Sequence, residues 1–232
     1  MAKRNLPGSD RIRHSHFFFP VVFLLIFGCS SKEASRVVFQ PRNDSAPVKI
    51  AVVPFQRVIP DDTAKTVRCP LTGIIYRSCA SAPAAEKILE KTFLSKMARY
   101  ERNLIPMDRV EGIYRRISSD SFKTAPREVL LKVGRELKAD YVIAGYLFCF
   151  RERQGYSYSV EKPALVSFGI YMIRTNDGVL AWKGVFDKAQ RSLLEDVFQL
   201  SSFIREKGRW VPAGELLDEG VDDVLRTFPE IH

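Results

Sequence analysis

The 232-residue sequence predicts an α/β domain of three-layer type, in which helices pack on a mixed β-sheet and a late antiparallel hairpin is followed by helices. Two observations support this prediction. β-branched apolar runs alternate with segments whose apolar residues recur at helical spacing, which is typical of parallel strands joined by helical crossovers. Asp177-Gly178 then lies between two β-rich runs, which is a strong signal for an antiparallel hairpin.

The first predicted strand is VKIAVVPF, residues 48–55, a β-branched run that ends at Pro54 and is expected to be buried on both faces. The segment 56–80 is predicted to be a long loop. Three helices are expected after it, one capped by Ser81, one beginning at Asp108 after a short strand in NLIPM, and one beginning near Thr124. Their inward-facing residues are predicted to be Ile88, Leu89, Phe93, Met97 and Tyr100, then Val110, Ile113, Tyr114 and Ile117, then Val129, Leu130, Val133 and Leu137.

The second half of the chain begins with ADYVIAGYLFCF, which is apolar on both faces up to Arg151 and predicts a central strand. The runs ALVSFGIYMIRT and GVLAWKGVF predict the two strands of the hairpin. One helix is expected over 190–204 and a last helix beyond GRWVPAG, with apolar positions at Leu193, Val197, Leu200 and Ile204, and at Leu217, Val221, Val224 and Phe228.

The N-terminal stretch HFFFPVVFLLIFGCSSK contains an apolar run of eleven residues that is interrupted by Pro20. A helix needs about 20 apolar residues to cross a bilayer, so this run is too short. Basic residues precede the run and small residues follow it, which is the order of a secretory signal peptide. We therefore expect residues 1–28 to be a signal peptide, residues 29–47 a flexible tether, and residues 48–232 the folded domain.

Cys29 ends the sequence Ile26-Phe27-Gly28-Cys29, which resembles the lipobox of bacterial lipoproteins, although Phe27 stands where that pattern prefers a small residue. The resemblance implies that Cys29 carries acyl chains such as palmitate, and more than one chain is what stable anchoring requires. Ser30 resembles the usual sorting choice for the outer membrane, with the domain facing the periplasm. The alternative is a plain signal peptide with an incidental cysteine.

The net charge of the chain is +9, and removal of residues 1–28 leaves 32 basic and 26 acidic residues. A modest basic excess of this kind indicates mainly solvated helix faces. An exported protein meets anionic lipid and cell-wall polymer rather than DNA, so we expect membrane lipid and an envelope protein as partners and no nucleic acid.

Three cysteines remain besides Cys29. Cys69 and Cys79 flank PLTGIIYRS, and in an oxidising compartment they are predicted to form a disulfide that closes this loop. The alternative is two unpaired thiols. Cys149 lies within an apolar run and is interpreted as a small buried hydrophobic residue. Since no CxxC pair is present, the spacing supports neither a zinc site nor a redox motif.

The segments VKIAVVPF, LKADYVIAGYLFCF and VSFGIYMIRTNDGVLAW occur in the order found in one group of envelope proteins. Over residues 48–187 the chain resembles the α/β domain shared by the TolB amino-terminal domain, the curli-secretion channel lipoproteins and the lipoprotein activators of penicillin-binding proteins. The resemblance implies a binding and assembly module without catalytic residues. The segment RERQGYSYSVEKP is too short and too charged for the two membrane strands of a curli-type pore. The C-terminal GRWVPAGELLDEGVDDVL resembles uncharacterised bacterial lipoproteins.

The sequence contains few candidates for catalytic residues. The only histidine after the predicted signal peptide is His232, so catalytic arrangements that need an internal histidine base are not supported. No phosphate-binding glycine motif follows the first strand, and Asp61-Asp62 is typical of a polar turn. We expect no enzyme activity, no cofactor and no metal site, and we expect an exposed acidic helix face made by Glu215, Asp218, Glu219, Asp222 and Asp223.

Candidate partner-binding residues are Tyr156 and Tyr158 in the connection QGYSYSV, and Trp210. The alternatives are that the tyrosines only cover the sheet edge and that Trp210 is a core residue. The leading hypothesis is a lipid-anchored docking or assembly module for an envelope protein complex. The second is a module that binds a small ligand or glycan in a deep aromatic pocket, and the third is an unrecognised hydrolase whose carboxylates converge in such a pocket.

Overall fold

The computed structural model describes residues 47–61, 65–100, 103–119, 124–156, 159–189 and 212–230, all within one compact unit of the chain. The predicted signal peptide, the tether apart from its last residue, and the predicted helix over 190–204 lie outside the described residues. Within the ranges that are described, no helix is long and apolar enough to cross a membrane.

The main sheet has six strands in the order β10-β9-β6-β1-β5, and β2 pairs with β6 beyond the end of β1. The pairs among β1, β2, β5 and β6 are parallel, whereas β9 runs antiparallel to both β6 and β10. The mixed sheet and the late hairpin are therefore confirmed. The strands are β1 (Lys49–Val52), β2 (Gln56–Arg57), β5 (Asn103–Leu104), β6 (Tyr141–Arg151), β9 (Leu165–Arg174) and β10 (Leu180–Ala189).

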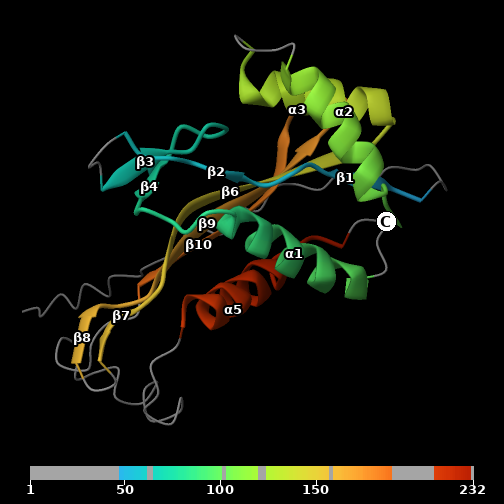
Figure 1. Cartoon of the computed structure of the whole chain (residues 1–232). Coiled ribbons are helices and arrows are strands. Elements are labelled where there is room, and N and C mark those ends of the chain that lie inside the picture. Colours follow the sequence, from blue (N-terminus) through green and yellow to red (C-terminus); the bar gives the residue numbers. More distant parts are fainter. Residues whose placement is uncertain are drawn as a thin grey trace, which may run out of the picture. The chain divides into compact units, whose positions relative to one another are not determined.

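Helices cover both faces of the sheet, which confirms the predicted three-layer α/β class (Figure 1). α2 and α3 lie on one face, and α1 and α5 lie on the other. The helices are α1 (Ala85–Met97), followed by the 3₁₀ turn η1 (Ala98–Tyr100), then α2 (Met107–Ser119), α3 (Pro126–Leu137) and α5 (Ala213–Leu225).

The two hydrophobic clusters explain why the central strands are apolar without alternation. In β1, Ile50 and Val52 join the cluster under α1 and α5, while Ala51 and the following Val53 join the cluster under α2 and α3. β6 divides its side chains in the same way. Successive side chains of a strand point to opposite faces, so a strand between two helix layers is buried at every position.

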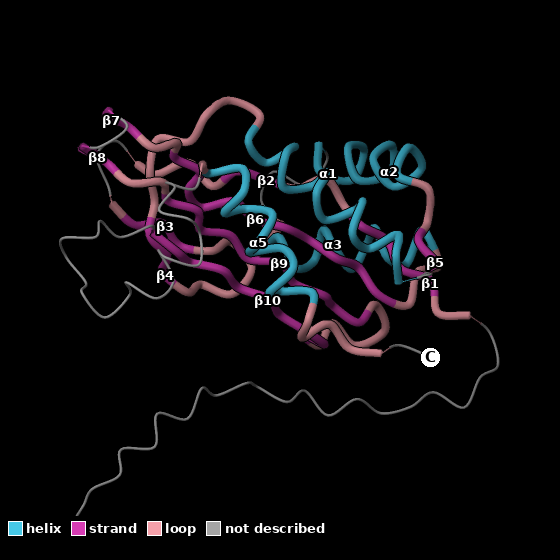
Figure 2. Tube along the Cα trace, turned by 90° about the horizontal axis from the view of Figure 1, so that it is seen from below, coloured by secondary structure: helices cyan, strands magenta, loops and turns pink. Residues whose placement is uncertain are grey.

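Two small hairpins lie toward the end of the sheet that is farther from β5 (Figure 2). The pair β3 (Thr66–Arg68) and β4 (Ile75–Arg77) occupies much of the segment that was expected to be a loop. β7 (Gln154–Tyr156) and β8 (Ser159–Lys162) continue the β6–β9 hairpin outward.

The start of α1 differs from the prediction. The helix begins at Ala85, after Ala84 in a left-handed conformation, and not after Ser81. The Ser81 hydroxyl instead accepts a hydrogen bond from the Phe150 amide of β6 at 2.8 Å. Ile88 was expected to face inward but is 46% exposed, because the buried positions of α1 recur every four residues from Ala85 and place Ile88 off that face.

The predicted last helix is confirmed as α5, whose residues Leu217, Val221 and Val224 are buried. It approaches β10 closely through two glycines. A Cβ atom at Gly184 would clash with Val224, and a Cβ atom at Gly220 would lie 2.7 Å from the Phe186 ring.

Candidate functional site

The β3–β4 hairpin is built by three cross-strand pairs and a tight turn. Gly73 has φ +72°, a conformation that side chains other than glycine rarely adopt, and its amide donates to the Cys69 carbonyl at 2.9 Å. Arg68 donates from Nη1 to the Gly73 carbonyl at 2.8 Å. The turn is therefore closed by its own backbone and by one arginine.

The inner face of this hairpin packs on the sheet. The Tyr76 ring stacks on Phe148 of β6 with a centroid distance of 4.3 Å, and its hydroxyl lies 3.2 Å from the Tyr171 hydroxyl of β9. Burial raises the pKa of Tyr171, and the hydrogen bond with Tyr76 raises it further, so this phenol is neutral at physiological pH. The other buried inward-facing residues of the hairpin are Val67, Cys69 and Leu71.

A disulfide between Cys79 and Cys149 fastens the chain just after β4 to the central strand β6. Ser78 adds a hydrogen bond from its hydroxyl to the Phe148 carbonyl at 3.3 Å. On the other side, Arg77 reaches the edge strand β10 and forms an ion pair with Asp187 at 2.9 Å. The hairpin is thus held at three points along the sheet.

The predicted Cys69–Cys79 disulfide is wrong. Cys69 is a free, buried thiol, and Cys149 is buried as expected but bonded. In the hairpin the Cys69 amide bonds to the Ile74 carbonyl and the Ser78 amide bonds to the Lys65 carbonyl, which places Cys79 five residues, or roughly 16 Å, from Cys69 along the strands. A disulfide requires a Cα separation of about 4.4–6.8 Å. The Cα atoms of Cys79 and Cys149 are 5.0 Å apart.

Exposed apolar residues occur in the hairpin, at Ile74 and Ile75, and after β2, at Ile59. Ile59, Ile74 and Ile75 are 72%, 45% and 58% exposed. Isolated exposed apolar residues are normal on protein surfaces, but two adjacent isoleucines in a well-anchored hairpin are unusual. The other large apolar residues that are exposed in the described part of the chain are Ile88, Val179 and Val185.

A separate pocket of about 170 Å³ lies between α2, the start of α3 and the sheet. Its lining carries no charged side chain, and the Gln56 amide donates to the Tyr114 hydroxyl within it. Burial raises the pKa of Tyr114, which keeps this hydroxyl neutral. The lining residues are Gln56, Tyr114, Ser118, Thr124, Pro126, Val129, Leu130 and Tyr146.

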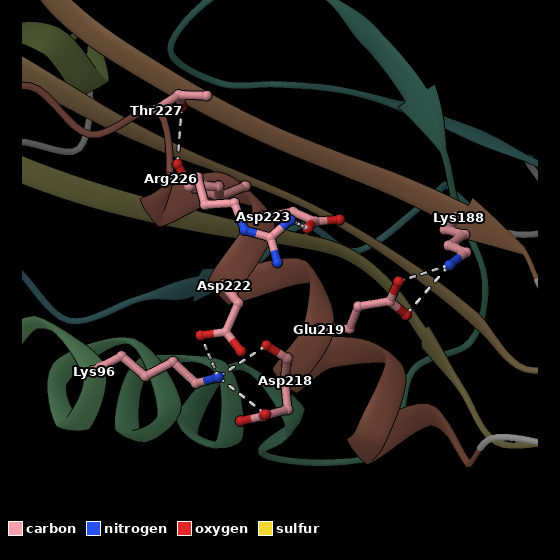
Figure 3. Close-up of polar contacts among 9 residues, drawn as sticks. Lys96, Lys188, Asp218, Glu219, Asp222, Asp223, Arg226 and Thr227 are labelled. Atoms are coloured by element: carbon pink, nitrogen blue, oxygen red, sulfur yellow. Dashed lines mark hydrogen bonds and ion pairs between the residues drawn. The ribbon is translucent and has the colours of Figure 1, made fainter. Parts of the chain in front are cut away.

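The predicted acidic helix face lies on α5, and cations occupy much of it (Figure 3). Lys96 of α1 binds Asp218 and Asp222 at 2.9 and 2.7 Å. Burial alone would lower the pKa of Lys96, but the hydrogen bonds with Asp222 and Asp218 outweigh it and raise the pKa. Lys188 of β10 binds Glu219, and Arg226 binds Asp223 within the helix.

Most of the predicted site residues are not placed. Cys29, Tyr158 and Trp210 lie outside the described residues, and Tyr156 is described only as backbone in β7. Sequence reasoning missed the exposed isoleucines. Gly73 followed by two adjacent isoleucines could have shown that at least one of them is exposed, since alternation in a hairpin turns at most one of two neighbours inward.

No family model matches the chain, and no curated protein matches it. Solved structures similar to it include the PelC dodecamer from Paraburkholderia phytofirmans, at 14% identity and TM-score 0.42, covering 77% of this chain and 85% of that one. Lipoprotein GNA1162 from Neisseria meningitidis matches at 11% identity and TM-score 0.40, covering 70% of this chain and 99% of that one.

A third similar structure is the LpoB C-terminal domain from Escherichia coli, at 14% identity and TM-score 0.39, covering 64% of this chain and 87% of that one. Proteins described as lipoproteins are therefore among the structures that this fold resembles. At these identities and TM-scores the likeness assigns no function.

Proposed function

We propose that this chain is a lipoprotein of the bacterial cell envelope, anchored in the outer membrane through acylated Cys29, and that its periplasmic α/β domain docks on another envelope protein without catalysing a reaction. The anchor is inferred from the signal peptide pattern and the lipobox-like sequence before Cys29.

The Cys79–Cys149 disulfide supports an exported location. Disulfides form and persist in oxidising compartments such as the bacterial periplasm, and they are rare in the cytosol. This bond joins residues 70 positions apart in the chain, so it belongs to the folded domain and not to a local loop. A domain with an internal disulfide is consistent with the periplasmic location that the N-terminal sequence predicts.

The observation that carries the docking role is the pair of exposed isoleucines Ile74 and Ile75 on the β3–β4 hairpin. Burial of an isoleucine side chain stabilises a protein by about 1.5–3 kcal/mol, and these two side chains are 45% and 58% exposed. Their hairpin is held to the sheet through Tyr76 and the disulfide, which makes it a rigid support. Apolar residues on a rigid element are suitable anchors for a protein interface.

The proposed role includes no reaction. Three carboxylates of α5 are held in ion pairs, since Asp218 and Asp222 bind Lys96 and Glu219 binds Lys188. Their charges are used to hold α5 against α1 and β10. A docking role needs only a stable scaffold and an exposed surface.

The test is crosslinking from the isoleucines in living cells. A photo-crosslinking amino acid replaces Ile75 in the full-length chain expressed in its own host, and the products are identified by mass spectrometry. The matched control places the same probe at Ile88, an exposed isoleucine on α1. We expect one envelope protein to be crosslinked from position 75 and not from position 88.

A second variant makes this test specific. Ile74→Asp in the same chain should abolish the crosslink from position 75, because it places a charge in the proposed apolar contact. Equal crosslinking from positions 75 and 88 would contradict the docking role, and so would products that contain only lipid. A crosslink that survives Ile74→Asp would also count against this surface.

The pocket beside Tyr114 favours a second candidate function, the binding of a small neutral ligand such as a sugar. Its volume of about 170 Å³ lies below the roughly 300–1,000 Å³ of typical ligand sites, so the docking role is preferred. The check is a titration with N-acetylglucosamine followed by NMR. Binding that is lost in Gln56→Leu would favour this function, whereas no binding would remove it.

A further inference from the structure

Strand β10 forms one edge of the main sheet. It pairs with β9 on one side, and among the residues that the structure describes no strand pairs with its other side. The strand is ten residues long and contains no proline. A long edge of this kind presents a row of backbone N–H and C=O groups that can pair with another chain.

The direction of the backbone groups follows from the hydrogen bonds at the end of β9. The Thr175 amide donates to the Asp140 carbonyl, on the β6 side, at 2.9 Å. The neighbouring Arg174 amide donates to the Val179 carbonyl, on the β10 side, also at 2.9 Å. Backbone directions alternate along a strand, so the odd-numbered residues of β9 face β6 and the even-numbered residues face β10.

This alternation identifies the backbone groups at the outer edge of β10. The β10 residues that pair with odd-numbered β9 residues are Lys183, Val185 and Asp187. Their N–H and C=O groups therefore point away from β9 and out of the sheet edge. The Asp187 carbonyl agrees with this direction, because it accepts a hydrogen bond from Arg77 Nη2 at 3.2 Å.

The side chains of Lys183, Val185 and Asp187 are all exposed on one face of the sheet. Val185 is 40% exposed, which is unusual for a valine in the middle of a ten-residue strand. The opposite face of β10, which includes Trp182 and Phe186, is buried in the cluster under α5. The strand thus presents one lysine, one valine and one aspartate in alternation beside its outward-pointing backbone groups, of which the Asp187 carbonyl already accepts from Arg77.

We propose that two copies of the chain pair antiparallel along β10, with Val185 at the two-fold axis. In this register each Val185 lies opposite the second copy's Val185, and each Lys183 lies opposite the second copy's Asp187. All three residues direct their backbone groups outward, so the pairs can exchange N–H···O=C hydrogen bonds. The Asp187 carbonyl accepts from Arg77 and has a second lone pair for the amide of the second copy. Two sheets then become one continuous sheet with a closed, self-complementary interface.

The charges select this register among its neighbours. An axis shifted by two residues would lie at Lys183 or at Asp187. It would place Lys183 opposite the Lys183 of the second copy, or Asp187 opposite the Asp187 of the second copy. Like charges directly opposite each other are destabilising. An axis at Gly184 or Phe186 would leave both charges opposite uncharged residues. Only the axis at Val185 places Lys183 opposite Asp187, whose carboxylate also binds Arg77 of its own chain at 2.9 Å, and buries the exposed valine against itself.

The α5 side of the strand is compatible with this pairing. Glu219 on α5 would approach the junction from each copy, but Lys188 of the same chain binds it at 2.9 Å (Figure 3). The next carboxylate, Asp223, is bound by Arg226 at 2.8 Å. Glu219 and Asp223 of each helix are therefore present as neutral ion pairs. The dimer does not depend on the proposed docking role or on the lipid anchor.

Charge exchange tests the register. The full-length chain is purified in detergent, and the dissociation constant of the dimer is measured by sedimentation. Lys183→Asp leaves the Arg77–Asp187 ion pair in place and creates two aspartate pairs across the axis, so the constant should rise about tenfold or more. Lys183→Asp combined with Asp187→Lys should restore it when Arg77→Glu is added, because the ion pair within the chain is then kept with its charges exchanged. Lys132→Asp on the exposed side of α3 is the matched control and should change nothing.

Cysteine trapping provides a second measurement. Hydrogen-bonded antiparallel pairs have Cα atoms about 5.5 Å apart, within disulfide reach, so Val185→Cys should crosslink two copies on mild oxidation. Val179→Cys, an equally exposed valine outside the register, should not. A monomer at all concentrations would overturn the proposal, as would a dimer that is indifferent to Lys183→Asp. Slow hydrogen exchange of the Val185 amide in a monomer would mean that another segment of the same chain pairs with the edge of β10. That result would also overturn the proposed dimer.

Discussion

Lys96 of α1 and Asp222 of α5 form an ion pair of 2.7 Å that joins the middle of the chain to its last helix (Figure 3). Lys96 also contacts the Asp218 carboxylate at 2.9 Å and the Asp218 carbonyl at 3.1 Å. The lysine side chain is 9% exposed, whereas the two carboxylates are 58% and 49% exposed. The ammonium group of Lys96 therefore relies on the two carboxylates for its charged partners, whereas the carboxylates are also hydrated.

This difference predicts unequal effects on stability. Asp218→Asn combined with Asp222→Asn should lower the free energy of unfolding by about 1–3 kcal/mol, because a buried ammonium group loses its charged acceptors. Lys96→Met should cost less, since an apolar side chain fills the same space and the carboxylates stay hydrated. Urea denaturation measures both variants. Asp223→Asn, in an exposed pair with Arg226, is the control and should change stability by less than about 0.5 kcal/mol. Equal losses in all three variants would contradict this account of Lys96.

The close approach of α5 to β10 predicts opposite effects for two glycines of one helix. Gly220→Ala should lower the free energy of unfolding by about 1–3 kcal/mol, because the new Cβ lies 2.7 Å from the Phe186 ring. Gly214→Ala meets nothing within 4 Å and should raise stability by about 0.5–1 kcal/mol through helix propensity. Thermal and urea unfolding distinguish the two. A stabilising Gly220→Ala would show that α5 is not seated against β10.

The disulfide pairing can be checked with cysteine variants. Removal of both Cys79 and Cys149 by alanine substitution should cost about 2–4 kcal/mol, since the bond closes a loop of 70 residues in the unfolded chain. Cys69→Ala should leave the disulfide intact. The readouts are urea denaturation and the mass shift on alkylation of free thiols. A newly reactive Cys79 in Cys69→Ala would revive the pairing expected from the sequence.

Stability should fall at alkaline pH. Burial raises the pKa of Tyr171 and Tyr146 above the ordinary value of 10.0, and the carboxylates that bind Lys96 raise its pKa above 10.5. The folded state then keeps protons that the unfolded state releases above about pH 10, so the contribution of these three groups to the free energy of unfolding is constant below that pH and decreases above it. Urea denaturation from pH 7 to 11 measures this dependence.

Tyrosine absorbance gives an independent reading of the same effect. The phenolate signals of Tyr146 and Tyr171 should appear only with unfolding, while exposed tyrosines titrate reversibly before it. Tyr146→Phe should reduce the late signal. Complete titration of all tyrosines in the folded protein would contradict the burial of these two hydroxyls.

The sequence determined the class of the fold. β-branched runs such as residues 48–55 and 141–150 have no polar face, so they require helices on both sides, and the structure has them. Asp177-Gly178 marked the β9–β10 turn because Gly178 adopts φ +72° there. The N-terminal signals are equally local, because length, charge order and a single cysteine define them. Each of these features depends on neighbouring residues alone.

The tertiary structure decided which residues that are distant in the sequence come into contact. Cys79 pairs with Cys149 and not with the nearer Cys69, because the hairpin register carries Cys79 to β6. The same register turns Tyr76 inward onto Phe148 and leaves Ile75 in water, although both belong to one apolar stretch of sequence. Hydrophobicity specifies that side chains are buried, and only the packing of hairpin, sheet and helices selects which of two adjacent residues is buried and which remains available for a partner.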